Sequence, residues 1–250
     1  MAVAGANMTK PAIIHLSPDA ALTAWPDFPE TEISSGARGN RGHRWFQDDE
    51  LGLGVWVWEA EANLGRWMNW PVHEFMVVVE GEVVVVEEDR ETVVGPGECF
   101  FIPKGRRCIW NQPRYFKKFM LMFDIPSEQS KGSARSIIKI DPQVKLGSSV
   151  VPTATSQSGP SVGHSHYYFK DANNQFSVGI WDATNWQNKL IEFPHHEMMH
   201  VLEGVVTFTD DKGSKRAFQP GDTFFIPMGA PTSWNVDGDL RMAFCRFQPN

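Results

Sequence analysis

The sequence has few cysteines and no long hydrophobic run. Three cysteines in 250 residues are an odd and sparse set, which indicates reduced thiols rather than a disulfide framework. No stretch of about eighteen consecutive apolar residues occurs, and the first ten residues lack a basic segment followed by a long apolar one. We therefore expect a soluble, cytoplasmic protein without a membrane segment.

Basic residues are also in short supply. The chain has 23 Lys and Arg against 30 Asp and Glu, which gives a formal net charge of -7 at pH 7. Binding to nucleic acid or to anionic lipid needs clustered positive charge, so neither is an expected partner, whereas a small ligand stays open. With 42% hydrophobic residues, the chain can nevertheless bury a substantial core, in one large domain or in two.

The sequence also lacks helical periodicity, because no long segment repeats apolar residues at helical spacing. Short runs rich in β-branched and aromatic residues, such as LGVWVW, FMVVVE and CFFIP, are separated by Gly, Pro and Asp turns. This pattern predicts an all-β sandwich, barrel or jelly roll. The expected strands at 74–80 and 197–203 are apolar on both faces apart from their first residue, so we expect them between two packed layers.

An internal duplication dominates what the sequence does contain. HEFMVVVEGEV at 73–83 returns as HEMMHVLEGVV at 196–206, and GPGECFFIPKG at 95–105 returns as QPGDTFFIPMG at 219–229. The copies lie 123 or 124 residues apart, and the chain between them has linker composition. The expected organisation is an N-terminal domain, a linker and a C-terminal domain, at 1–126, 127–135 and 136–250.

Two spaced motifs carry a resemblance to a known superfamily. E-x6-G occurs at 74–81 and 197–204, and G-x5-P-x-G follows at 97–105 and 221–229. Both motifs resemble those of the cupin superfamily, which implies a bicupin of two tandem double-stranded β-helix barrels of the jelly-roll, RmlC-like type. A Trp-acid pair before the first motif and Trp-Asn after the second make the chain similar to the ethanolamine-utilisation and ureidoglycine aminohydrolase group of cupins.

The resemblance would imply a metal centre whose ligands are missing here. Metal-binding cupins carry H-x-H four or five positions before the motif glutamate, and a fourth ligand after the second motif. The residues at these positions are Trp67 or Met68, Asn69 or Trp70, and Cys108 in the first half, and Leu190 or Ile191, Glu192 or Phe193, and Thr232 in the second. A transition metal needs about three converging N, O or S donors, so we expect none in the N-terminal half and no cofactor as the leading hypothesis.

The segment FPHHEMMHVLEG at 193–204 keeps a metal site open in the second half. Glu192, Glu197 and either His195 or His196 could together hold Mn, Fe, Ni or Zn. Period-2 alternation places His200 on the strand face opposite Glu197, which favours a structural role for His200.

Each half retains one motif glutamate and several aromatic side chains. A carboxylate that faces an apolar barrel has to be paired, hydrogen-bonded or protonated, because unpaired burial is costly. It could act as a general acid or base, or it could only pin the strands. The candidate ligand-binding residues are Glu74, Trp67, Cys108 and Trp110 in the first half, and Glu192, Glu197, Thr232 and Trp234 in the second.

Two functions stay open at this point. One is a metal-free bicupin that binds a small metabolite in a barrel. The alternative is a metal-dependent, aminohydrolase-like enzyme for small nitrogenous or carboxylic metabolites, with its active site in the C-terminal half. A homodimer is also open, since doubly apolar strands could be buried between chains. The fold does not decide among these functions, and the sequence assigns no catalytic residue.

Overall fold

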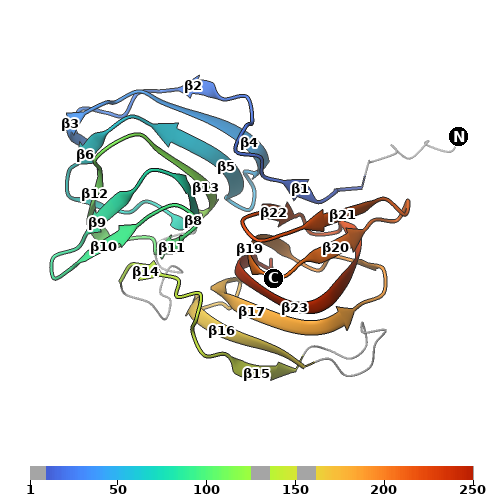
Figure 1. The fold of residues 1–250 in the computed structure, drawn as a ribbon. Helices are drawn as coiled ribbons and strands as arrows, with labels where there is room; N and C mark the ends of the chain where they lie inside the picture. The colour runs from blue at the N-terminus through green and yellow to red at the C-terminus, as the bar shows by residue number, and fades with distance from the viewer. Residues whose placement is uncertain (1–9, 125–135, 151–161, 250) are drawn as a thin grey trace, which may run out of the picture.

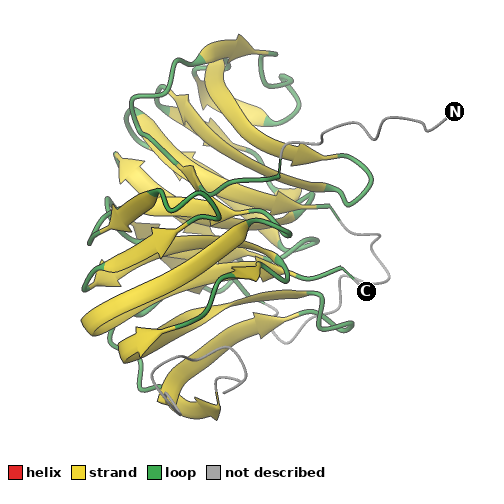
Figure 2. Cartoon of the chain, turned by 90° about the vertical axis from the view of Figure 1, so that its right-hand side faces the viewer, coloured by secondary structure: helices red, strands yellow, loops and turns green. Residues whose placement is uncertain are grey.

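The protein is described here from a computed structural model, which covers residues 10–124, 136–150 and 162–249 (Figure 1). The expected linker at 127–135 lies outside the described residues. The described residues form strands, turns and loops only, so none of them belongs to a helix that could span a bilayer (Figure 2). The prediction of an all-β fold is confirmed.

The N-terminal barrel consists of two facing antiparallel sheets. One sheet has the order β14-β11-β8-β13-β5-β4-β2, and the other has the order β10-β9-β12-β6-β3, with β7 paired to β12. The strands are β2 (Thr23–Trp25), β3 (Ile33–Gly36), β4 (Asn40–Asp48), β5 (Leu53–Ala60), β6 (Asn63–Gly65), β7 (Met68–Asn69), β8 (His73–Glu80), β9 (Val83–Val86), β10 (Glu91–Val94), β11 (Cys99–Ile102), β12 (Arg107–Gln112) and β13 (Phe116–Phe123).

The C-terminal barrel repeats this plan with fewer, longer strands. Strand β17 covers the stretch that corresponds to β5 and β6, and β23 covers the stretch that corresponds to β12 and β13. Its strands are β15 (Gly147–Val150), β16 (Val162–Lys170), β17 (Phe176–Gln187), β18 (Ile191–Glu192), β19 (His196–Glu203), β20 (Val206–Thr209), β21 (Lys215–Phe218), β22 (Thr223–Ile226) and β23 (Pro231–Phe247). The tandem jelly-roll architecture is therefore confirmed.

A short strand ahead of each barrel pairs with the other barrel (Figure 1). Strand β1 (Ile14–His15) pairs with β22 of the C-terminal barrel, and β14 (Ile138–Lys139) pairs with β11 of the N-terminal barrel. Beyond each strand, the next backbone N–H donates to the same neighbour, from Leu16 to the Thr223 carbonyl and from Ile140 to the Cys99 carbonyl. This reciprocal exchange ties the two halves together through main-chain hydrogen bonds.

The two barrels also share one hydrophobic core. Phe101 contacts Phe169 with ring centroids 4.7 Å apart, and Phe123 contacts Phe247 at 4.5 Å, each pair joining the two halves. Strands β8 and β19 flank this core, so one face of each packs inside its own barrel and the other packs against the neighbouring barrel. The doubly apolar pattern of these strands is thus satisfied within one chain.

The motif glycines end β8 and β19 in a left-handed conformation beside another strand. Gly204 has φ +78°, and a Cβ atom there would lie 1.9 Å from the Asp239 carbonyl oxygen. Gly213 has nearly the same φ of +80°, but nothing lies within 4 Å of a Cβ built on it. The two positions separate the conformational cost of a side chain from its steric cost.

We predict that Gly213→Ala lowers the free energy of unfolding by about 1 kcal/mol, since only left-handed strain is introduced. Gly204→Ala should cost roughly 3 kcal/mol or more, because the clash forces the backbone of β23 to move. Urea denaturation of both variants measures the difference. Equal losses would show that the close approach at Gly204 does not constrain the fold.

Candidate functional site

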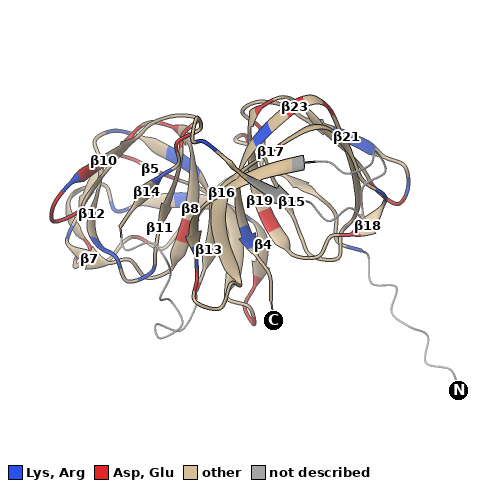
Figure 3. Cartoon of the chain, turned by 90° about the horizontal axis from the view of Figure 1, so that it is seen from below, with Lys and Arg blue, Asp and Glu red and all other residues tan. Residues whose placement is uncertain are grey.

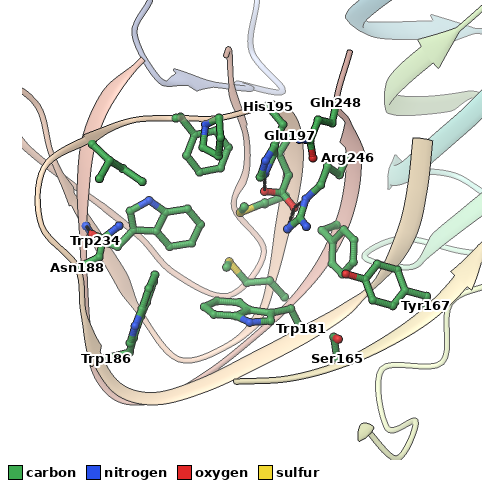
Figure 4. A pocket seen from close by; sticks show the side chains of 16 residues that line it. Ser165, Tyr167, Trp181, Trp186, Asn188, His195, Glu197, Trp234, Arg246 and Gln248 are labelled. Atoms are coloured by element: carbon green, nitrogen blue, oxygen red, sulfur yellow. Dashed lines mark hydrogen bonds and ion pairs between the residues drawn. The ribbon is translucent and has the colours of Figure 1, made fainter. Parts of the chain in front are cut away.

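A cavity of about 390 Å³ lies inside the C-terminal barrel (Figure 4). Three indole rings form much of its wall, with centroid separations of 5.7 Å for Trp181 and Trp186, 5.9 Å for Trp181 and Trp234, and 5.5 Å for Trp186 and Trp234. Phe193 stacks on Trp234, with ring centroids 5.8 Å apart. Edge-to-face packing of this kind holds the rings in place, so the apolar wall is preformed.

A charged cluster of Glu197, Arg246 and His195 occupies one end of this cavity (Figure 4). Arg246 donates to Glu197 Oε1 from Nε at 3.1 Å and from Nη2 at 2.9 Å, and His195 Nε2 lies 2.8 Å from Glu197 Oε2. The strand register explains the contact, because Arg246 of β23 is the cross-strand partner of Glu197 in β19. His195 stands two residues before Glu197 and therefore shares its strand face.

Electrostatics keep Glu197 and Arg246 charged. Burial alone would raise the pKa of Glu197, but Arg246 and His195 outweigh it and hold that pKa below its usual value. Burial would lower the pKa of Arg246, but Glu197 and the Tyr167 hydroxyl raise it. Glu197 is therefore an ionised carboxylate whose two oxygens both have partners.

One residue of the cavity wall carries a buried hydrogen-bond donor that has no partner in the described part of the chain. The indole Nε1–H of Trp186 is buried and makes no hydrogen bond there. The side chain of Asn188 is fixed beside Trp234, because its Oδ1 accepts from the backbone N–H of Trp234. A donor that is buried without a partner costs about 1–3 kcal/mol.

The N-terminal barrel contains a second cavity, of about 360 Å³, with its own charged pair. Lys118 Nζ lies 2.7 Å from Glu74 Oε1, and Trp70 donates to Glu74 Oε2 from Nε1 at 3.0 Å. The ammonium also lies 4.5 Å from the ring centroid of Trp110 and 5.1 Å from that of Trp58. Burial lowers the pKa of Lys118, and Glu74 works against that shift.

The repeat allows the two cavities to be compared position by position. Their glutamates and aromatic walls correspond, as Glu74 with Glu197, Trp58 with Trp181, Trp70 with Phe193, and Trp110 with Trp234. The cations do not correspond, because Met122 stands where the second barrel has Arg246, and Met242 stands where the first has Lys118. The equivalent glutamates of the two barrels are thus paired with cations that stand at different inward-facing positions of the last strand.

Two of the candidates in the N-terminal half line its cavity and two do not. Glu74 and Trp110 line it. Trp67 is 42% exposed, with the guanidinium of Arg107 5.0 Å from its ring centroid. Cys108 is fully buried outside the lining, and its pKa is raised to about 12, chiefly by that burial, so it is not a thiolate nucleophile at neutral pH.

The candidates in the C-terminal half divide in the same way. Glu197 and Trp234 line the cavity. Glu192 does not, because its side chain is 70% exposed and forms an ion pair with Lys10 at 3.5 Å. Thr232 is fully buried outside the lining, and its hydroxyl has no hydrogen-bond partner among the described residues.

The three histidines of the same segment are separated by strand alternation. His195 lines the cavity, whereas His196 faces the core shared by the barrels and stacks on Phe225. His200 also faces away from Glu197, and its Nδ1 lies 2.9 Å from the Thr223 hydroxyl. Burial lowers the pKa of His196 and brings that of His200 to about 4, so both are neutral at pH 7.

Sequence reasoning missed the two cations, although a weak signal for them exists. Lys118 and Arg246 each interrupt an apolar stretch of the last strand of a barrel, in FKKFMLMF and AFCRF. Alternation along β13 puts Lys118 on the same face as Met120 and Met122, which line the cavity. A basic residue at an inward position of such a strand indicates a buried counter-charge.

A EutQ-like cupin domain matches residues 52–119 and 170–243, more than half of the chain. The chain belongs to the EutQ-like cupin family. The two matched regions fall in the two barrels, which makes the protein a bicupin. Comparison with curated protein sequences gave no match.

Solved structures share the fold of this bicupin. A protein of unknown function from Pseudomonas syringae pv. tomato is 22% identical, with 95% of this chain and 100% of that chain covered and a TM-score of 0.74. A cupin 2 conserved barrel domain protein from Leptotrichia buccalis is 11% identical, with 86% and 92% covered and a TM-score of 0.56. Ylba from E. coli is 10% identical, with 98% and 94% covered and a TM-score of 0.56. At these identities the likeness establishes the fold alone.

The residues at the positions that cupins use for a metal do not suit one. At the positions where metal-binding cupins carry H-x-H, the residues that line the cavities are Met68 and Trp70 in the first barrel and Ile191 and Phe193 in the second. In the second cavity, the guanidinium of Arg246 further disfavours a cation beside Glu197. Within the described residues, no three His, Cys, Asp or Glu side chains form a metal-binding group.

We predict that Glu197→Gln lowers the free energy of unfolding by about 1–3 kcal/mol at pH 7, because the partly buried Arg246 loses its counter-charge. Glu192→Gln, at an exposed glutamate, should change it by less than about 0.5 kcal/mol. Urea denaturation of the two variants and the wild type measures both values.

The loss of stability caused by Glu197→Gln should depend on pH and become smaller in acid. Since the pKa of Glu197 is lower in the folded state, its contribution is present above the unfolded pKa and is lost as the pH falls through the folded value. The gap between wild type and Glu197→Gln should therefore narrow in acid. A gap that stays constant down to the acid transition would contradict an ionised Glu197.

Proposed function

We propose that this bicupin binds a small metabolite in its C-terminal barrel, without the H-x-H metal site of other cupins. The ligand class that fits is a flat, largely apolar molecule with a carboxylate or carbonyl group. The observation that carries the proposal is the preformed cavity of about 390 Å³, in which an aromatic wall faces the Arg246 guanidinium.

The aromatic wall supports the flat part of this description. Trp181, Trp186 and Trp234 offer indole surfaces to a molecule inside the barrel, and Met199 and Met242 add apolar surface between them. Small-molecule sites are typically concave and apolar, with a few fixed polar groups that set orientation. A planar ring system would gain contact with the indoles without requiring the barrel to rearrange.

The polar end supports the carboxylate or carbonyl part. Both oxygens of Glu197 already accept hydrogen bonds or ion pairs, so the carboxylate has little left to offer a ligand. The Arg246 guanidinium is a donor in the lining of the cavity. A ligand oxygen would accept from this guanidinium, whereas a ligand ammonium would meet its positive charge.

One observation favours an enzyme as a second candidate function. His195 lies in the cavity with Nε2 2.8 Å from Glu197 Oε2. A carboxylate that orients an imidazole is an arrangement typical of general acid–base catalysis. The two candidates differ in one outcome: a binding protein returns its ligand unchanged after prolonged incubation, and an enzyme does not.

Trp186→Phe tests the proposed binding mode, with benzoate and nicotinate as probes and isothermal titration calorimetry as the measurement. The substitution keeps an aromatic ring but removes part of the indole surface that a flat ligand would contact, so we expect the affinity for both carboxylates to fall about tenfold. The melting temperature without ligand should fall by a few degrees, because Trp186 is buried and packs edge-to-face on Trp181 and Trp234.

Trp110→Phe serves as the matched control, because it removes an indole from the other barrel. It should leave the affinity of the C-terminal site unaltered. Benzylamine, which is flat but cationic, should bind more weakly than benzoate. Absence of binding by both carboxylates, or tighter binding of benzylamine, would overturn the proposed ligand class.

A further inference from the structure

The N-terminal barrel holds a lysine in a place where barrel packing does not require one. Lys118 is 5% exposed and lies on the inner wall of a cavity of about 360 Å³. The equivalent residue of the second barrel is Met242, and that barrel closes around the same aromatic walls without a cation there. A buried lysine is expensive to desolvate, so its presence beside an open volume suggests chemistry rather than packing.

The kind of cation matters as much as its position. The second barrel neutralises its glutamate with Arg246, and a guanidinium keeps its proton under all ordinary conditions. The first barrel uses Lys118, whose ammonium can lose a proton to become a nucleophilic amine. Met122 stands at the position of Arg246, so the first barrel supplies its cation from a different position of the same strand.

Burial favours the neutral form of Lys118, and Glu74 provides a proton acceptor. Burial lowers the pKa of Lys118, whereas Glu74 and the indole faces of Trp58 and Trp110 favour the ammonium. Glu74 Oε1 lies 2.7 Å away, at proton-transfer distance, while Trp70 Nε1–H holds its other oxygen at 3.0 Å. Glu74 can therefore take a proton from Lys118 and give it back without moving.

We propose that the N-terminal barrel is a second, covalent site, in which Lys118 forms an imine with a small flat aldehyde or ketone. Glu74 takes one proton from the Lys118 ammonium. The amine nitrogen then attacks the carbonyl carbon, a C–N bond forms as the π electrons move onto oxygen, and Glu74 gives its proton to that oxygen. Glu74 next takes a proton from the nitrogen and gives it to the hydroxyl, and the C–O bond breaks as the nitrogen lone pair forms the C=N bond and water leaves. One ammonium and one carbonyl give one protonated imine and one water, so no oxidant or reductant is consumed.

The shape and lining of the cavity define the carbonyl compound. Trp58, Trp70 and Trp110 line the volume around Nζ, and Met68 and Met120 add flexible apolar surface. An aromatic or heteroaromatic carbonyl compound would stack on these rings with its carbonyl carbon near the nitrogen. This site does not depend on the ligand proposed for the C-terminal barrel, whose arginine has no nucleophilic amine.

Reductive trapping tests the proposal on the full-length protein. Benzaldehyde is added with cyanoborohydride for a short time, and benzylated lysines are located by peptide mass spectrometry. Burial lowers the pKa of Lys118 and so raises its neutral amine fraction, and Lys118 should therefore be labelled several-fold faster than surface lysines. Lys145 and Lys189, both exposed, provide the internal comparison.

Variants separate the site from general amine chemistry. Lys118→Met installs the residue of the second barrel, and it should remove the fast-reacting site while leaving the labelling of Lys145 and Lys189 unchanged. Glu74→Gln should slow labelling of Lys118 and not of those two. Labelling of Lys118 in the wild type that is no faster than at Lys145 would overturn the proposal, and that result needs no variant to fold.

Discussion

Burial of one carboxylate at the start of the motif strand governs the interior of each barrel. Glu74 and Glu197 are 3% and 1% exposed, so neither can rely on water to stabilise its charge. In a low-dielectric interior an unpaired charge costs far more than the hydrogen bonds of a strand return. Each barrel therefore needs a cation within hydrogen-bonding distance, and the position of that cation decides the chemistry available in the cavity.

Duplication has allowed the two barrels to meet this requirement differently. The aromatic walls correspond, whereas the cation comes from Lys118 in one copy and from Arg246 in the other. Basic and acidic residues occur in both barrels (Figure 3). A guanidinium gives a permanent donor with a fixed shape, which suits recognition of an oxygen acceptor. An ammonium that burial makes easier to deprotonate suits reaction with a carbonyl carbon. The two proposed sites thus have corresponding aromatic walls and differ in their cation.

The shared core explains why both cavities can be preformed. Strands β8 and β19 each line a cavity with one face and pack against the neighbouring barrel with the other. The exchanged strands β1 and β14 add main-chain hydrogen bonds on the same side. Glu74 and Glu197 therefore sit on strands that are fixed from behind. A ligand meets side chains that have already lost their conformational freedom, which reduces the entropic cost of binding.

The sequence predicted the fold and the faces of β19 because both follow from local patterns. The duplication sets the number of barrels, and alternation puts Glu197 and Met199 on the cavity face and Met198 on the other. Alternation also explains why Trp67 and Glu192 lie outside the cavities. Each is one residue away from an inward position, and a shift of one residue turns a side chain to the opposite face.

The cations could not be predicted in the same way, since their pairing is not local. Arg246 lies 49 residues after Glu197, and Lys118 lies 44 residues after Glu74. The repeat even argues against each of them, because methionine occupies the equivalent position of the other copy. Each cation reaches its carboxylate only through the register of the last strand of its barrel, β13 or β23, on the motif strand. That register is irregular between Lys117 and Lys118 in β13 and between Val201 and Glu203 in β19. A buried acid in a sequence therefore predicts that a counter-charge exists, while the folded sheet determines which residue supplies it.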